Sequence, residues 1–225
     1  SYLYGGLIMK IAVFVSGGGT NLQAIIDRVQ SGFLPNVEIS LVLSSSSDAY
    51  ALTRASNYGI PSVVCSAKNY PSRELWDEAV LDHVMKSGAT LIVLAGYLSL
   101  LGSKVVKAFS NRIINVHPAL IPSFCGAGMY GINPHIAVLQ RGVKVSGATV
   151  HFVNENYDEG PIILQKAIEV LQDDTPESLQ KRIMVNCEQV ILPEAIRLIS
   201  EDKIEVKNNL VVFKNDNREE KNEDI

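Results

Sequence analysis

The sequence predicts an α/β protein with a doubly wound, mostly parallel sheet and helices on both faces. Residues 11–15, 37–43 and 91–94 are almost entirely apolar, which is typical of strands buried on both faces of a sheet. Amphipathic stretches with helical spacing separate these runs. The composition, with 47% hydrophobic and 20% charged residues, is that of an ordinary globular domain.

The elements of the first half alternate regularly. They are predicted, in chain order, as a strand at 11–15, a helix with Leu22, Ile25, Ile26 and Val29 on one face, a strand at 37–43, a helix at 49–58 ended by Gly59, a strand at 62–64, a helix at 72–86, and strands at 91–94 and 112–115. This alternation indicates βαβ units.

The second half has a different pattern. Residues 123–133 are rich in glycine and lack periodicity, which predicts a loop that is suited to an active-site lid. Two longer strands are expected at 145–153 and 161–170. Thr175-Pro176-Glu177 has the N-cap, proline and acid that open a helix, and Pro193 should kink that helix. A terminal hairpin is expected at 206–213 around Asn208-Asn209.

Bulk properties exclude several classes of protein. The net charge is −4 without a basic stripe, so no nucleic-acid partner is expected. No apolar run reaches the roughly 18–20 residues of a membrane span. The three cysteines form no metal framework, and we interpret each as a small core residue in a reducing, cytoplasmic compartment. Residues 1–8 are interpreted as an expression remnant or an extended start, and 214–225 as a disordered charged tail.

The strand that ends in Asn115-Val116-His117-Pro118 is the strongest candidate for chemistry. Asn115 and His117 are two residues apart, so their side chains should share one face and project into one cleft. An oxyanion donor beside a titratable base is what acyl transfer to an amine requires. A strand end with an incidental histidine is the alternative that these four residues leave open.

A glycine loop, Ser16-Gly17-Gly18-Gly19-Thr20-Asn21-Leu22, lies between the first strand and the first helix. The helix start offers free N–H groups to an anion, so phosphate binding is predicted, with a tight connecting turn as the alternative. The Walker lysine is missing, and Leu22 stands where a dinucleotide fingerprint needs glycine. The second strand ends in serines rather than an acid. A small phosphorylated substrate therefore fits better than NAD or ATP.

The other polar candidates are weaker. We interpret His83 as a surface residue and His151 as a hydrogen-bonded structural histidine, while His135, near a helix start, is ambiguous. Asp158 precedes Glu159-Gly160-Pro161 and has the features of a turn residue. It is also the acid best placed to reach a histidine at a strand end.

Taken together, these motifs resemble the formyltetrahydrofolate-dependent formyltransferases. The resemblance rests on Gly-Gly-Gly-Thr-Asn at 17–21, Asn-Val-His-Pro-Ala-Leu-Ile-Pro at 115–122, His-Phe-Val at 151–153 and Asp-Glu-Gly-Pro-Ile at 158–162. It extends over about residues 9–213. The phosphate loop and the compact length point to the branch that acts in purine biosynthesis. The implied fold is Rossmann-like, as a single domain at 9–213 with a phosphate-binding half (9–110) and a catalytic, folate-binding half (111–213).

The resemblance implies the chemistry and its residues. Glycinamide ribonucleotide would accept the formyl group of 10-formyltetrahydrofolate, the co-substrate, by direct amine attack without a metal. Asn115, His117 and Asp158 would form the catalytic set, with Asp158 holding His117. The residues that would bind the ribonucleotide are Gly19, Thr20, Asn21 and Glu188. Those that would bind the folate are Arg73, Leu100, Leu101, Asn115 and Asp158. For Glu188, helical periodicity alone favours a solvated residue instead. A homodimer is left open.

Two features depart from the family pattern. Ser99 stands where bacterial members carry arginine, which predicts one contact fewer to the folate tail. The loop at 125–133 is longer and resembles plant-like sequences. Four other functions remain as alternatives: formyltetrahydrofolate hydrolysis, formyl transfer to methionyl-tRNA, formyl transfer to a sugar nucleotide, and a non-catalytic nucleotide-binding module that uses only the glycine loop.

Overall fold

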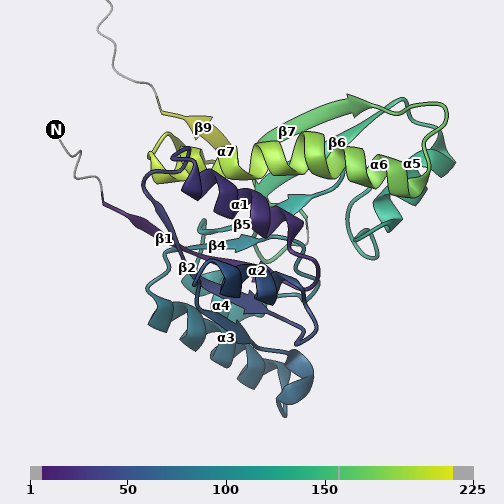
Figure 1. Ribbon diagram of the computed structural model, residues 1–225. Coiled ribbons are helices and arrows are strands. Elements are labelled where there is room, and N and C mark those ends of the chain that lie inside the picture. The colour runs from purple at the N-terminus through teal and green to yellow at the C-terminus, as the bar shows by residue number, and fades with distance from the viewer. Residues whose placement is uncertain (1–6, 157, 215–225) are drawn as a thin grey trace, which may run out of the picture.

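The computed structural model describes residues 7–156 and 158–214 (Figure 1). The predicted remnant at 1–8 and the predicted tail therefore lie largely outside the described residues. No helix in the described part of the chain is long and apolar enough to cross a membrane.

Within these residues, seven strands form one sheet in the order β3-β2-β1-β4-β5-β6-β7. Their bounds are β1 Met9–Val15, β2 Val37–Ser44, β3 Ser62–Val64, β4 Leu91–Leu94, β5 Ile113–His117, β6 Val145–Phe152 and β7 Ile162–Glu169. The first five strands are parallel, whereas β6 and β7 each run antiparallel to their neighbour. The predicted doubly wound, mostly parallel sheet is confirmed.

Helices cover both faces of the sheet (Figure 1). Their bounds are α1 Thr20–Gln30, α2 Ala51–Asn57, α3 Arg73–Ser87, α4 Ser103–Ala108, α5 Asn133–Arg141, α6 Pro176–Ile183 and α7 Gln189–Ser200. One buried cluster joins the sheet to α1, α2, α6 and α7, and a second joins its other face to α3 and α4. The six-residue helix α4 was not predicted, because it is too short to show an apolar period.

The C-terminal helices form one long run that lies beside α1 in Figure 1. A π-helical turn at Met184–Glu188 joins α6 to α7, and Pro193 lies inside α7. A π-helical turn is one of the recognised causes of helix bending. This long helix is therefore irregular at the π-helical turn as well as at Pro193. The sequence pattern predicts a kink at the proline but not the π-helical turn.

The terminal hairpin consists of β8 Ile204–Lys207 and β9 Leu210–Phe213. Its two connecting residues, Asn208 and Asn209, have φ values of 52° and 60°. Asparagine tolerates this left-handed conformation, and a two-residue turn of this kind matches the twist of paired strands. The hairpin expected around the two asparagines is present.

Candidate active site

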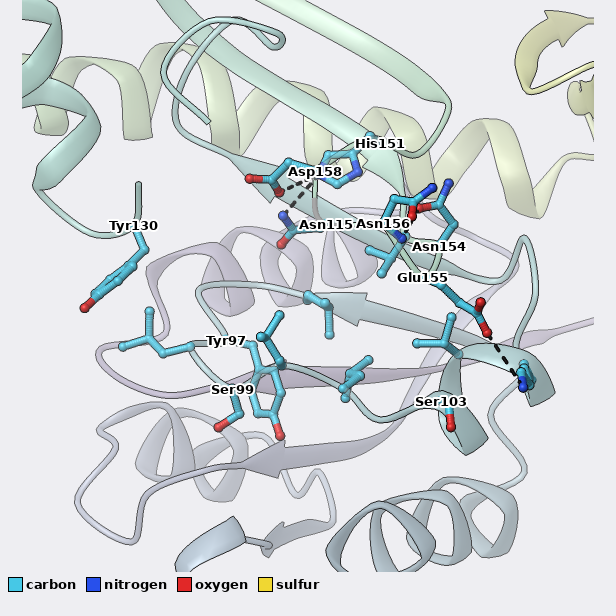
Figure 2. Close-up of a pocket in the computed structure, with 17 residues that line it drawn as sticks. Tyr97, Ser99, Ser103, Asn115, Tyr130, His151, Asn154, Glu155, Asn156 and Asp158 are labelled. Atoms are coloured by element: carbon cyan, nitrogen blue, oxygen red, sulfur yellow. Dashed lines mark hydrogen bonds and ion pairs between the residues drawn. The ribbon is translucent and has the colours of Figure 1, made fainter. Parts of the chain in front are cut away.

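A cavity of about 590 Å³ opens at the carboxyl ends of β4 and β5. Its walls include Asn115, His151 and Asp158 on one side and Tyr97 and Ser99 on the other (Figure 2), and Leu98 and Leu100 also line it. In open α/β sheets, ligands bind outside the carboxyl ends of the strands. The volume is within the range of small-molecule sites, about 300–1,000 Å³.

Asn115 enters this cavity from β5. It lies directly opposite His151 of the antiparallel strand β6, and its Nδ2 is 3.3 Å from His151 Nε2. The other ring nitrogen of His151, Nδ1, is 2.9 Å from the carbonyl oxygen of Phe152, to which it donates in the neutral ring. The Asn115 amide can then donate to Nε2. His151 thus fixes the orientation of the Asn115 side chain.

Asp158 belongs to the same group. One of its oxygens accepts a hydrogen bond from the Gly126 N–H at 2.9 Å, and the other lies 3.7 Å from His151 Nε2. Burial lowers the pKa of His151, while the Phe152 carbonyl and Asp158 partly oppose this shift. His151 is therefore expected to be neutral near pH 7 and to accept rather than donate at Nε2.

His117 is buried and has a different partner. It lies two residues after Asn115 on β5 but is not among the residues that line the cavity, and its Nε2 is 2.8 Å from the carbonyl oxygen of Phe124. In the described residues, Asp158 contacts His151 and Gly126 and not His117. The Asp158–His117 pairing that the family resemblance implies is thus not present here. Each of the two side chains contacts the backbone of the loop at 123–126 instead, His117 at the Phe124 carbonyl and Asp158 at the Gly126 N–H.

His151 is buried and hydrogen-bonded, as the sequence interpretation predicts. It also contacts Asn115 and lies beside Asp158, which the sequence interpretation does not predict (Figure 2). The His-Phe-Val motif was a signal, but only the antiparallel register of β5 and β6 places this ring opposite Asn115. His135, the ambiguous histidine, is fully buried, and its two ring nitrogens have no hydrogen-bond partner within the described part of the chain. Burial lowers its pKa to about 4.

The glycine loop lies at the end of β1, where α1 begins. Gly19 occupies the N-cap position with φ 73° and ψ 31°, and a Cβ atom there would lie 2.6 Å from Ala51 Cβ. Glycine is therefore required both by conformation and by space. The loop brings free N–H groups of the helix start to the same edge of the sheet as the cavity.

Asn21 and Glu188 meet beside this loop although they are 167 residues apart. Asn21 Nδ2 donates to Glu188 Oε1 at 3.2 Å, and both side chains are at least 95% buried. The alternative that helical periodicity alone favours for Glu188, a solvated helix residue, is therefore excluded. Burial raises the pKa of Glu188 to about 7, and the hydrogen bond from Asn21 opposes this.

Two acceptor atoms of this pair have no partner among the described residues. They are Asn21 Oδ1 and Glu188 Oε2. Buried polar atoms are nearly always hydrogen-bonded, so unpaired acceptors indicate a site for a ligand that carries donors. One N–H of the Asn21 amide is directed at Glu188, and the backbone N–H of Asn21 adds a donor at the start of the helix.

The residues expected at the folate lie around the cavity. Leu100 and Leu101 line it, as does Ser99. Arg73 begins α3, donates to the carbonyl oxygen of Leu100 at 2.7 Å, and stacks on the Trp76 ring. Arg73 therefore supports the wall that carries Leu100.

The cysteines differ from one another in burial. Cys65 and Cys187 are buried, as expected of small core residues. Cys125 is only partly buried and lies on the loop next to the cavity, with its Sγ 3.3 Å from the Pro122 carbonyl oxygen. The interpretation of Cys125 as a core residue is therefore wrong, because the loop at 123–133 packs on the surface.

Comparison with known proteins identifies the family. The model of the formyl transferase family matches residues 9–196. The chain belongs to this family.

Individual relatives and solved structures agree with this assignment. A chloroplastic phosphoribosylglycinamide formyltransferase of Arabidopsis thaliana is 42% identical over 87% of this chain, which spans 66% of that relative's length. The phosphoribosylglycinamide formyltransferase of Haemophilus influenzae is 38% identical, covering 89% of this chain and 92% of the relative. The glycinamide ribonucleotide transformylase 1 structure from Symbiobacterium toebii has a TM-score of 0.88 at 41% identity, covering 96% and 99% of the two chains. A formyltetrahydrofolate deformylase structure from Pseudomonas syringae has a TM-score of 0.83 at 27% identity, covering 92% of this chain and 66% of its own.

Proposed function

We propose that this chain transfers the formyl group of 10-formyltetrahydrofolate to the amino group of glycinamide ribonucleotide, a step of purine biosynthesis. The observation that carries the proposal is the shared position of two sites. The glycine loop ends β1 and Asn115 lies on β5, and both strands run parallel to β4 between them. Their carboxyl ends thus meet at one sheet edge, where an amine held at the loop can reach a carbonyl held in the cavity.

The ribonucleotide has a matching set of groups beside the loop. Its phosphate would accept from the backbone N–H groups of Gly19, Thr20 and Asn21, since the start of a helix favours an anion. Its ribose hydroxyls would donate to the unpaired oxygen of Glu188. The ribose would thereby satisfy a buried acceptor that lacks a partner.

The folate would occupy the cavity of about 590 Å³. Leu100 and Leu101 would contact it through their side chains and backbone. Arg73 would support this wall through its hydrogen bond to the Leu100 carbonyl oxygen, and its guanidinium charge would lie near the folate tail. Asn115 and Asp158, on the opposite wall, would face the formyl-bearing end (Figure 2).

The reaction needs one bond made, one bond broken and one proton moved. The glycinamide nitrogen attacks the formyl carbon, and the carbonyl oxygen becomes an oxyanion. The bond from the formyl carbon to N10 of the folate then breaks, and the proton lost by the amine is delivered to N10. Neither a covalent enzyme intermediate nor an external oxidant or reductant enters this balance.

Asn115 and His117 would stabilise the oxyanion. The Asn115 amide has a second N–H besides the one directed at His151. His117 Nε2 donates to the Phe124 carbonyl oxygen, so His117 would donate to the oxyanion from Nδ1 as an imidazolium, with both ring nitrogens protonated. Asp158 would assist proton movement from the amine. His151 acts through its neighbours as a positioning residue, because it contacts Asn115 and lies beside Asp158.

Replacing His117 tests this mechanism. The variant H117A should lower kcat by about 10²–10³, because one oxyanion donor is lost, while the KM values change little. The measurement is a spectrophotometric assay with 10-formyltetrahydrofolate, run with and without glycinamide ribonucleotide. H83A is the matched control, since His83 is a partly buried histidine on α3 that does not line the cavity, and it should keep the parent turnover.

Two outcomes would contradict the proposal. Near-normal turnover of H117A would remove His117 from the mechanism. Deformylation at the same rate without the ribonucleotide would assign the chain to hydrolysis, as in the deformylase of similar fold.

The compartment and the oligomeric state are further parts of the proposal. The described cysteines are all free, which supports a reducing compartment such as the cytoplasm. A homodimer stays a prediction, and sedimentation of the purified chain would test it.

A further inference from the structure

The start of α2 holds two consecutive carbonyl groups of the glycine loop. The Ala51 N–H donates to the Gly17 carbonyl oxygen at 3.1 Å, and Arg54 Nε donates to the Gly18 carbonyl oxygen at 2.7 Å. Both carbonyls therefore point towards α2. This contact is a feature that the formyl-transfer chemistry does not by itself explain.

The direction of a carbonyl determines the direction of the next amide. In a trans peptide the C=O and the following N–H point in opposite directions, and the peptide bonds of this loop are trans. The N–H groups of Gly18 and Gly19 must then face away from α2. Neither donates a hydrogen bond within the described residues. With Gly19 in the left-handed conformation, successive amides of this kind form a concave anion-binding nest.

Arg54 is itself held in place. Its Nη1 donates to Gln23 Oε1 at 3.2 Å, and its guanidinium carbon is 4.9 Å from the centre of the Tyr50 ring. A Cβ atom on Gly19 would lie 3.3 Å from Arg54 Cδ, so the side chain packs directly against the loop. A planar guanidinium can bind a carbonyl, an amide oxygen and a ring face together, which a lysine ammonium cannot do.

An independent observation indicates that a ligand sits beside the loop. Asn21 Oδ1 and Glu188 Oε2 are buried acceptors without partners, and Asn21 is the second residue of α1. These acceptors require hydroxyl or amine donors, whereas the amides of Gly18 and Gly19 require an acceptor. A ligand that combines a phosphate with hydroxyl groups satisfies both.

We propose that Arg54 is a positioning residue for the phosphate subsite: by holding the Gly18 carbonyl, it aims the Gly19 amide at the phosphate of the substrate. This inference rests on the proposed function and adds a residue that does not touch the substrate. It also assigns to α2 the role of a support for the glycine loop.

Three variants separate this role from a general effect of charge. R54Q removes the charge and the Nε donor, and R54K keeps the charge but loses the planar fork. R28Q is the matched control, because Arg28 borders the same cavity of about 340 Å³ as Arg54 but stacks on Phe33 and holds no loop carbonyl. KM and kcat are measured for both substrates.

The expected result is selective. R54Q should raise KM for the ribonucleotide by roughly 10–100-fold, the loss typical of one charge-assisted hydrogen bond, with KM for the folate and kcat within about twofold of the parent. R54K should recover only part of this loss, and R28Q should match the parent. Full recovery in R54K, an equal effect in R28Q, or an unchanged KM in R54Q would each overturn the positioning role.

A second measurement remains informative if a variant folds poorly or if the proposed function fails. Inorganic phosphate is titrated into the isotope-labelled parent chain and into R54K, and the amide resonances of Gly18 and Gly19 are followed by NMR. Saturable shifts in the parent that weaken in R54K support the proposal even if no formyl transfer is found. Absent shifts in the parent, or identical titrations of the two proteins, overturn it.

Discussion

Glu188 combines deep burial with an ionisable group, and this has a consequence for stability. Its side chain is 4% exposed, and burial raises its pKa from 4.5 to about 7. A carboxyl group whose pKa is higher in the folded than in the unfolded state stabilises the fold in its protonated form. The contribution is fully present below pH 4.5 and is lost as the pH rises through about 7.

The substitution E188Q makes this consequence measurable. Glutamine stays neutral at every pH and can still accept from Asn21. The free energy of unfolding of the parent should fall relative to that of E188Q between pH 4.5 and 7 and remain at a constant difference above this range. Urea unfolding of both proteins at a series of pH values checks this. Two curves that run parallel across the whole range would show that Glu188 titrates normally.

Residues near the cavity show how far local sequence can predict a site. Asn115 and His117 were recognisable because two residues of one strand share a face. The contact of Asp158 with His151 was not, because it depends on where a turn places its side chain. In that turn Asp158 has a φ of 54°, a conformation that the sequence does not specify.

Among the elements, α6 has the clearest local determinants. Thr175 Oγ1 accepts from the Ser178 N–H at 3.1 Å, and Ser178 Oγ accepts from the Thr175 N–H at 2.9 Å, which forms a capping box. The predicted N-cap is therefore present, followed by Pro176. This helix leads into the π-helical turn that carries Glu188, so its start also bears on the ribonucleotide subsite.

Removing the cap should weaken the protein measurably. We expect T175A to lower the free energy of unfolding by about 1 kcal/mol, because one N–H at the helix start loses its partner. T175S keeps the oxygen and should stay close to the parent. Equilibrium urea unfolding gives both values. A loss in T175A no larger than that in T175S would exclude the capping contact as a source of stability.

The whole molecule is organised around one continuous sheet. The proposed halves, 9–110 and 111–213, meet at the parallel pair β4 and β5. One buried cluster contains residues of both halves, among them Val13 and Leu22 from the first and Val150 and Leu192 from the second. Separating the halves would expose this cluster to water, so we propose that 9–213 is a single cooperative domain.

Cooperativity predicts coincident unfolding of the two halves. The single tryptophan, Trp76, is fully buried in the first half and reports on it by fluorescence. Far-UV circular dichroism reports on the whole chain, including α5, α6 and α7. The two probes should give one urea midpoint. A fluorescence transition that is complete before the circular dichroism changes would show that the halves are separate domains.

The sequence by itself determined the strands, most of the helices and the candidate catalytic strand of this protein. Apolar runs indicated β1, β4 and β5, a glycine loop marked the start of α1, and Thr175-Pro176 marked the start of α6. These signals are local, because side-chain periodicity and capping act within a few residues of the chain.

Only the tertiary structure decided which residues meet. It placed His151 opposite Asn115, Glu188 against Asn21, and Arg54 on the Gly18 carbonyl. These pairs are 36, 167 and 36 residues apart in the chain. Their contacts depend on strand register, on the π-helical turn and on how α2 packs against the loop. Such features arise from the packing of whole elements, so the local periodicity of the sequence does not predict them.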